Sequence, residues 1–139
     1  MNPLHDARKI APKRILIADD AASARDLVRA ILRRSGYEVF EAEDGEEALE
    51  SATRLQPDLV ILDLQMPKLD GCSVASRLRA MPLFEGTPIL AVSAAISQTE
   101  HAKLMQAGFS NFLAKPISPA RLRSTIIDMF DAVDTQEES

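Results

Sequence analysis

The sequence predicts one α/β domain in which five strand–helix units build a doubly wound, parallel sheet. Short apolar runs alternate with longer segments whose apolar residues recur at helical spacing. Strands that alternate with helices in this way are typical of parallel βαβ units with right-handed crossovers. The chain of 139 residues is long enough for one proper core, and 46% hydrophobic against 27% charged residues is an ordinary globular balance.

The first three units are marked by apolar runs and by residues that start or stop helices. Strands are predicted at 15–18, 37–42 and 59–62. The third run is apolar throughout, which indicates a central strand buried on both faces. Gly36, Pro57 and Pro82 are expected to end the three helices, and Asp44 with Glu47 has capping-box spacing at the start of the second.

The last two units follow the same pattern. Strands are predicted at 87–92 and 111–114. Ser97 with Glu100 forms a capping box that opens the fourth helix, and Gly108 is expected to end it. Ser118 followed by Pro119 opens the final helix. Its last residues carry only acidic charge, which opposes the helix macrodipole, so the last turn is expected to fray.

The remaining features bound the kind of protein. Residues 1–12 are predicted to be a flexible leader, residues 13–133 the domain and residues 134–139 an acidic tail. The net charge of −5 makes a nucleic-acid-binding surface unexpected, and the single Cys72 cannot form an internal disulfide. The lone cysteine favours a reducing compartment, so we expect a cytoplasmic protein with no direct nucleic-acid partner. No apolar stretch approaches the ~18 residues of a membrane span, so no membrane contact is expected.

Polar residues follow or end four of the five predicted strands. Asp19 and Asp20 follow the first, Asp63 ends the third, Ser93 the fourth and Lys115 the fifth. Taken singly, each has a plain explanation, since acids cap helices and a lysine is commonly a solvated charge. In a parallel sheet, however, these strand ends share one edge, where open α/β sheets bind their ligands. Their joint occurrence therefore favours a site.

The residue types at this edge indicate a particular chemistry. Three neighbouring carboxylates repel one another unless a cation lies among them. Carboxylates with a backbone carbonyl favour Mg²⁺, whereas the lack of a His or Cys cluster disfavours zinc. A carboxylate beside Mg²⁺ and a lysine can act as a nucleophile toward phosphorus. Mg²⁺, Lys115 and the Ser93 hydroxyl could then neutralise the phosphoryl oxygens.

The ordered set of these residues resembles the receiver domain of bacterial two-component response regulators, the CheY-like family. The resemblance covers residues 13–133 and is carried by Asp19-Asp20, Asp63 in the stretch DLQMPKLDG, Ser93-Ala94, Phe112 and Lys115-Pro116. It implies a flavodoxin-like (βα)5 fold with strand order 2-1-3-4-5. It also implies a stand-alone phosphoacceptor of a two-component or phosphorelay system, which is a signalling module and not an enzyme.

The resemblance assigns roles at the acidic edge. Asp63 is the implied phosphoacceptor, and Lys115, expected to precede a cis proline bond, should contact the phosphoryl group. Asp20, Asp63 and the backbone carbonyl of Gln65 are the implied Mg²⁺ ligands. Asp19 is expected to act on the metal through a bound water.

The resemblance also implies a switch and partners. Ser93 should move toward the phosphate and Phe112 turn inward behind it, which changes the face of the fourth helix, fifth strand and fifth helix. The expected partners are a sensor histidine kinase or histidine phosphotransfer protein and, because nothing follows residue 139, a separate effector protein. Ser110-Asn111 stands where the family often has two acids used in dimers, so a monomer or weak dimer is expected.

Three other functions stay open. A haloacid-dehalogenase-type phosphatase also uses an aspartyl nucleophile, but its D-x-D pattern would require an acid where this chain has Gln65. A flavin-binding electron carrier needs a phosphate loop after the first strand, where Asp19-Asp20 would repel phosphate. A receiver-like scaffold that is never phosphorylated usually lacks an acid or the lysine, and this chain has them all.

Overall fold

The computed structural model describes residues 11–94 and 97–138, and its strands form one parallel sheet in the order β2-β1-β3-β4-β5. The strands are β1 (Arg14–Ala18), β2 (Glu38–Ala42), β3 (Leu59–Asp63), β4 (Ile89–Ser93) and β5 (Asn111–Ala114). The helices are α2 (Ala22–Arg34), α3 (Gly45–Leu55), α4 (Gly71–Arg79), the short 3₁₀ helix η1 (Pro82–Phe84), α5 (Gln98–Ala107) and α6 (Pro119–Glu138). The fold class and strand order predicted from the sequence are confirmed.

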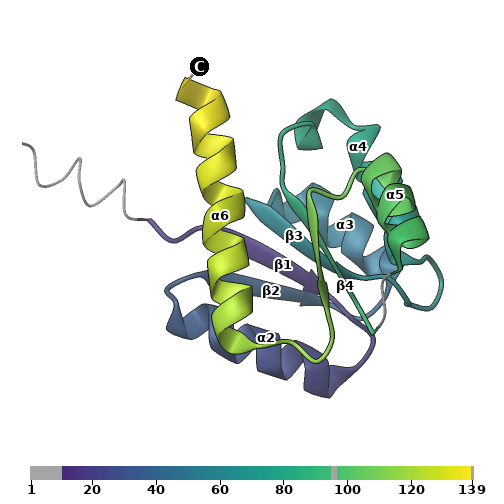
Figure 1. Ribbon diagram of the computed structural model, residues 1–139, viewed down its shortest axis with the longest axis horizontal. Coiled ribbons are helices and arrows are strands. Elements are labelled where there is room, and N and C mark those ends of the chain that lie inside the picture. Colours follow the sequence, from purple (N-terminus) through teal and green to yellow (C-terminus); the bar gives the residue numbers. More distant parts are fainter. Residues whose placement is uncertain (1–10, 95–96, 139) are drawn as a thin grey trace, which may run out of the picture.

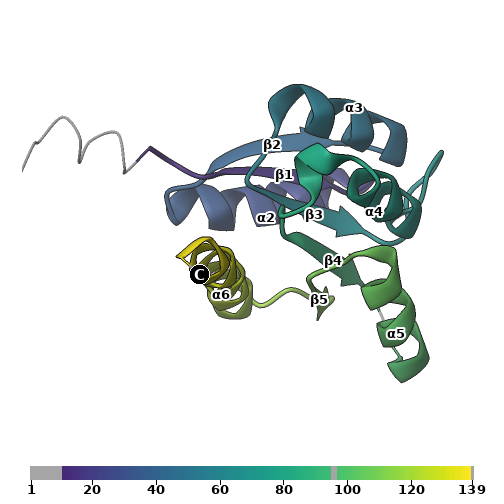
Figure 2. The ribbon, with the colours of Figure 1, turned by 90° about the horizontal axis from the view of Figure 1, so that it is seen from above.

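Helices cover both faces of the sheet (Figure 1). Figure 2 shows α2 and α6 on one side, with α3, α4 and α5 on the other. The central strand serves both layers, because alternate side chains point to opposite faces. Leu59 and Ile61 pack with α2 and α6, whereas Val60 and Leu62 pack with α3 and α4. All residues of β3 are buried, as its apolar run predicted.

Side-chain caps fix where three helices begin. Asp44 accepts a hydrogen bond from the amide of Glu47 at 2.8 Å, and the Ser97 hydroxyl accepts one from the amide of Glu100 at 3.2 Å. Both caps were predicted. Asp70 caps α4 in the same way, through the amide three residues on at 2.8 Å. It therefore fixes the start of the helix that follows the loop after β3.

The predicted leader lies mostly outside the described residues, whereas most of the predicted acidic tail lies within them. Of the predicted leader, residues 1–12, the first ten lie outside the described residues. At the other end α6 continues to Glu138, past the boundary predicted at residue 133, so the acidic segment is helical as far as it is described. None of the helices in the described residues is long and apolar enough to cross a membrane.

The start of α3 packs against the loop between β3 and α4 without room for a side chain. A Cβ at Gly45 would overlap the main-chain oxygen of Leu69 and lie 2.6 Å from its Cβ. We predict that Gly45→Ala lowers the free energy of unfolding by about 1–3 kcal/mol, because the backbone must move.

Urea unfolding followed by circular dichroism measures this loss. Gly86→Ala is the matched control, since nothing lies within 4 Å of a Cβ at Gly86. Its effect should stay within about 0.5 kcal/mol. Equal losses in the two variants would contradict the packing argument.

Candidate functional site

Three carboxylates meet at the carboxyl ends of β1 and β3. These strands are neighbours with Ala18 in register with Leu62, so the residues that follow lie side by side. Asp19 and Asp63 are buried, with 6% and 7% of their surface exposed, whereas Asp20 is exposed. One oxygen from each of the three carboxylates lies within 4.8 Å of the others. The structure thus brings together the three acids that the sequence placed at one edge.

Lys115, directly after β5, reaches two of these acids. Its Nζ lies 3.1 Å from Asp19 Oδ2 and 3.4 Å from Asp63 Oδ2. The amide of Lys115 donates to the carbonyl of Ser93 at 2.7 Å, and the bond to Pro116 is cis, as the resemblance implied. The lysine is therefore anchored beside β4 while its ammonium bridges two buried acids.

The loop after β3 orients the Asp63 carboxylate. The amide of Leu64 donates to the Val92 carbonyl at 3.1 Å, which continues the β3–β4 pairing past the end of the strand. The next amide, that of Gln65, donates to Asp63 Oδ1 at 3.1 Å. One carboxylate oxygen thus faces a loop amide and the other faces Lys115. The predicted role of the Gln65 carbonyl as a metal ligand remains a prediction.

Burial and neighbouring charges shift the pKa values of Asp63 and Lys115. Burial raises the pKa of Asp63 and the charge of Asp19 adds to this, while the Gln65 amide and Lys115 act in the opposite direction. Burial lowers the pKa of Lys115, but its contacts with Asp19 and Asp63 outweigh this and raise the value. Three acids with one lysine leave an excess of negative charge, which a divalent cation would offset.

The two predicted switch residues lie on the neighbouring strands β4 and β5, and β4 adjoins the strand that ends in Asp63. Ser93 is buried, one residue beyond the position paired with Asp63, and is in register with Ala114 on β5. Phe112 is half-buried and packs edge-on against the ring of His101 on α5, with centroids 4.1 Å apart. Phe112 thus links β5 directly to α5, the helix that follows the Ser93 strand.

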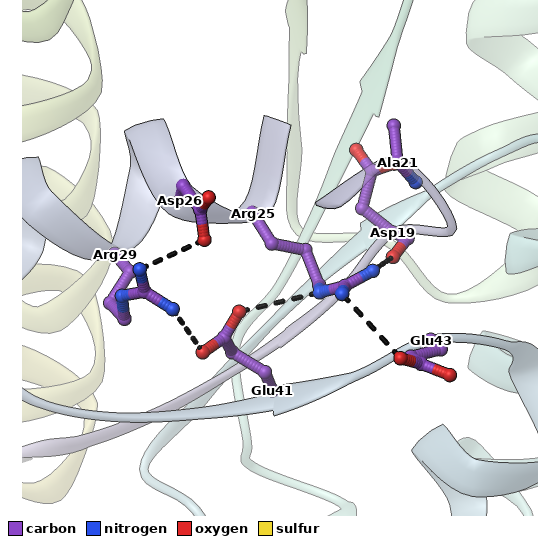
Figure 3. A network of polar contacts seen from close by, with 7 residues as sticks. All are labelled: Asp19, Ala21, Arg25, Asp26, Arg29, Glu41 and Glu43. Carbon is purple, nitrogen blue, oxygen red and sulfur yellow. Dashed lines mark hydrogen bonds and ion pairs between the residues drawn. The ribbon is translucent and has the colours of Figure 1, made fainter. Parts of the chain in front are cut away.

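A network of charged side chains borders the acidic pair on the α2 side, and no site role was predicted for it (Figure 3). Arg25 Nη1 donates to the main-chain oxygen of Asp19 at 2.6 Å, and Arg25 Nε donates to Glu41 Oε1 at 3.3 Å. Arg29 Nη1 holds the other oxygen of Glu41 at 2.7 Å. Helical spacing marks these arginines only as members of a polar face, which is normally solvated.

The fold and its acidic edge are shared with a known family. A family model described as the response regulator receiver domain matches residues 15–127. The chain belongs to this family. It is 39% identical to the regulatory protein PhoP of Bacillus subtilis (strain 168) over 114 residues, 82% of this chain and 47% of that protein. It is 40% identical to PrrA of Mycobacterium tuberculosis over 113 residues, 81% of this chain and 48% of that one, so the chain spans about half of these relatives.

Solved receiver structures resemble the whole fold. The chemotaxis protein CheY4 of Vibrio cholerae superposes with a TM-score of 0.83 at 32% identity, covering 86% of this chain and 99% of that one. The receiver domain of the sensor histidine kinase PA1611 from Pseudomonas aeruginosa PAO1 has a TM-score of 0.76 at 34% identity, covering 83% and 94%. That domain holds a magnesium ion in its active site cleft. The carboxylate oxygens of Asp19, Asp20 and Asp63 in this chain are the kind of donor that Mg²⁺ prefers.

The pKa of Asp63 gives a stability prediction for the metal-free protein. A carboxyl whose pKa is raised by folding favours the fold below its unfolded pKa, near 3.9, and loses that contribution as the pH rises through the folded value. In EDTA, Asp63→Asn should therefore raise the free energy of unfolding at pH 7, and the gain should shrink below about pH 4.

Urea unfolding over a pH series measures the gain relative to the unsubstituted chain. Asp128→Asn, which neutralises an exposed acid on α6, is the control and should show no comparable pH-dependent gain. A gain for Asp63→Asn that was constant with pH, or a loss at pH 7, would contradict the argument.

Proposed function

We propose that this chain is a phosphoacceptor module that takes a phosphoryl group onto Asp63 from a histidine kinase or histidine phosphotransfer protein. Receiver domains of response regulators interact with histidine kinases, and this chain belongs to that family. The observation that carries the proposal is the buried Asp63 carboxylate, held between a loop amide and Lys115 beside two further acids. In this proposal the chain is a signalling module and not an enzyme.

The proposed step is a displacement at phosphorus. One Asp63 oxygen forms the new bond, the bond from phosphorus to the donor imidazole nitrogen breaks, and the electron pair leaves with that nitrogen. Lys115, whose ammonium already faces Asp63, stabilises the transferred phosphoryl oxygens. Asp20, Asp63 and the Gln65 carbonyl, with Asp19 through a water, would hold Mg²⁺, which would offset charge on the phosphoryl group.

The proposed output is a change in the face formed by α5, β5 and α6. Ser93 ends β4 next to the phosphoacceptor strand, and Phe112 lies against His101 on α5, so a shift of Ser93 can pass to this face through packing. The exposed basic side chains of this face are His101, Lys103, Arg121 and Arg123. They favour an acidic surface on a separate effector protein. Cytoplasmic localisation and a monomeric or weakly dimeric state remain predictions.

Phosphorylation at Asp63 is the direct test of this function. After incubation with acetyl phosphate and Mg²⁺, intact-mass spectrometry should show one added phosphoryl group. The addition should be lost in Asp63→Asn and on chelation of Mg²⁺ with EDTA, and retained in the Asp128→Asn control. Full labelling of Asp63→Asn would place the acceptor elsewhere, and an unlabelled native chain would favour a scaffold that works without phosphorylation.

The output face is tested with beryllofluoride, a phosphoryl mimic, by amide NMR shifts. Shifts beyond the acids should concentrate in residues 97–123. Ser93→Ala should reduce them, because the serine hydroxyl can no longer donate to the charged mimic. Ser76→Ala, which removes an exposed hydroxyl on α4, should leave them intact. Shifts confined to α2 and α3 would show that this output face is wrong.

A further inference from the structure

We propose that Arg25 is a positioning residue for the metal site, and that it acts by holding the peptide unit between Asp19 and Asp20. The inference rests on the proposed function of the acids as a Mg²⁺-assisted phosphoacceptor site. The Arg25 side chain is only 11% exposed, and its Nη1 donates to the main-chain oxygen of Asp19 at 2.6 Å. That oxygen and the amide nitrogen of Asp20 belong to the same planar peptide.

The orientation of that peptide chiefly affects where the Asp20 carboxylate points. The Asp19 side chain is fixed independently, because Oδ1 accepts from the amide of Ala21 at 2.9 Å and Oδ2 faces Lys115 at 3.1 Å. The amide of Asp19 is also paired, with the Ala42 carbonyl of β2 at 3.2 Å. Asp20 is exposed, so the direction of its carboxylate depends on how the main chain enters and leaves it. Arg25 fixes the entering peptide.

Arg25 is itself held in place by acids from β2 and the residue beyond it (Figure 3). Its Nε lies 3.3 Å from Glu41 Oε1, and its Nη2 lies 3.7 Å from Glu43 Oε1. Glu41 is in turn held by Arg29 at 2.7 Å, and Arg29 also pairs with Asp26 at 2.8 Å. The planar guanidinium therefore spans a carbonyl and two carboxylates at once, which a lysine ammonium cannot reproduce from the same stem.

An electrostatic role and a positioning role for Arg25 predict opposite changes in Mg²⁺ affinity when the side chain is removed. As a cation beside the acids, Arg25 repels a divalent cation, so a purely electrostatic role predicts tighter Mg²⁺ binding when the charge is removed. As a positioning residue, it keeps Asp20 directed at the metal, so its removal should weaken binding. Loss of a group that supports a metal ligand typically costs 10–100-fold in affinity. The direction of the change separates the two roles.

The experiment is a Mg²⁺ titration of the full chain, followed by the amide NMR shifts of Asp19, Asp20 and Asp63. Arg25→Met and Arg25→Lys should each bind Mg²⁺ about tenfold more weakly. Without metal, the amide nitrogen of Asp20 should also shift, because the carbonyl of its own peptide has lost its donor. Arg29→Met is the matched control. It removes a cation from the same network but leaves the contacts of Arg25 with Asp19 and Glu43 in place, so both readouts should change far less than in Arg25→Met.

Each outcome decides between the alternatives. Equal or tighter Mg²⁺ binding by Arg25→Met, or native affinity in Arg25→Lys, would overturn the positioning role. If Arg25→Met fails to fold, the affinity of Arg25→Lys decides alone. A native chain that binds no Mg²⁺ would overturn the inference together with the metal assignment of the proposed function. Native Mg²⁺ binding without labelling at Asp63 would overturn the phosphoacceptor proposal and leave the role of Arg25 standing.

Discussion

The buried carboxylate of Asp63 is the constraint on which the rest of the site depends. It ends a strand that is buried along its whole length, where an ionised group is costly unless other groups compensate. A loop amide and Lys115 supply part of that compensation, but Asp19 adds a second buried acid within the same few ångströms. Burial still raises the pKa of Asp63. The metal-free fold therefore carries an unfavourable charge that a cation can relieve.

The sheet topology is what brings these groups together. Asp19 and Lys115 lie 96 residues apart in the chain, yet both contact the cluster that contains Asp63. After β1 the chain adds β2 on one side and later β3 on the other, so strand order reverses between β1 and β3. Loops diverge at such a switch point and leave a crevice at the carboxyl ends. The acids stand where that crevice is expected.

Features with local signals could be predicted from the sequence. The apolar run of β3, the acids at strand ends and the caps at Asp44 and Ser97 each depend on neighbouring residues, and the structure has all of them. The end of α6 could not be predicted from charge, since acids at a helix C-terminus cost only about 0.3–1 kcal/mol each. The η1 turn was also missed, because Pro82 signals only that a helix stops.

The contact between Arg25 and the Asp19 carbonyl has no such local sequence signal. An arginine on the polar face of a helix has the same spacing whether it is solvated or reaches across to another element. Only the placement of α2 against β2 brings Glu41 and the acidic loop within its reach. A contact that depends on tertiary placement leaves no local pattern, and for this reason the sequence predicted the acidic cluster but not the contact that Arg25 makes with it.

The elements on the two sides of the site differ in how many buried apolar residues hold them in place. On one side, β2 and α2 contact Asp19, and α2 buries Val28, Ile31 and Leu32. On the other side, α5 buries only Leu104. Elements with few buried apolar contacts open or shift at the lowest free-energy cost. A change of charge at Asp63 should therefore be taken up by α5 and the Phe112 ring that packs on it, while the acids keep their geometry.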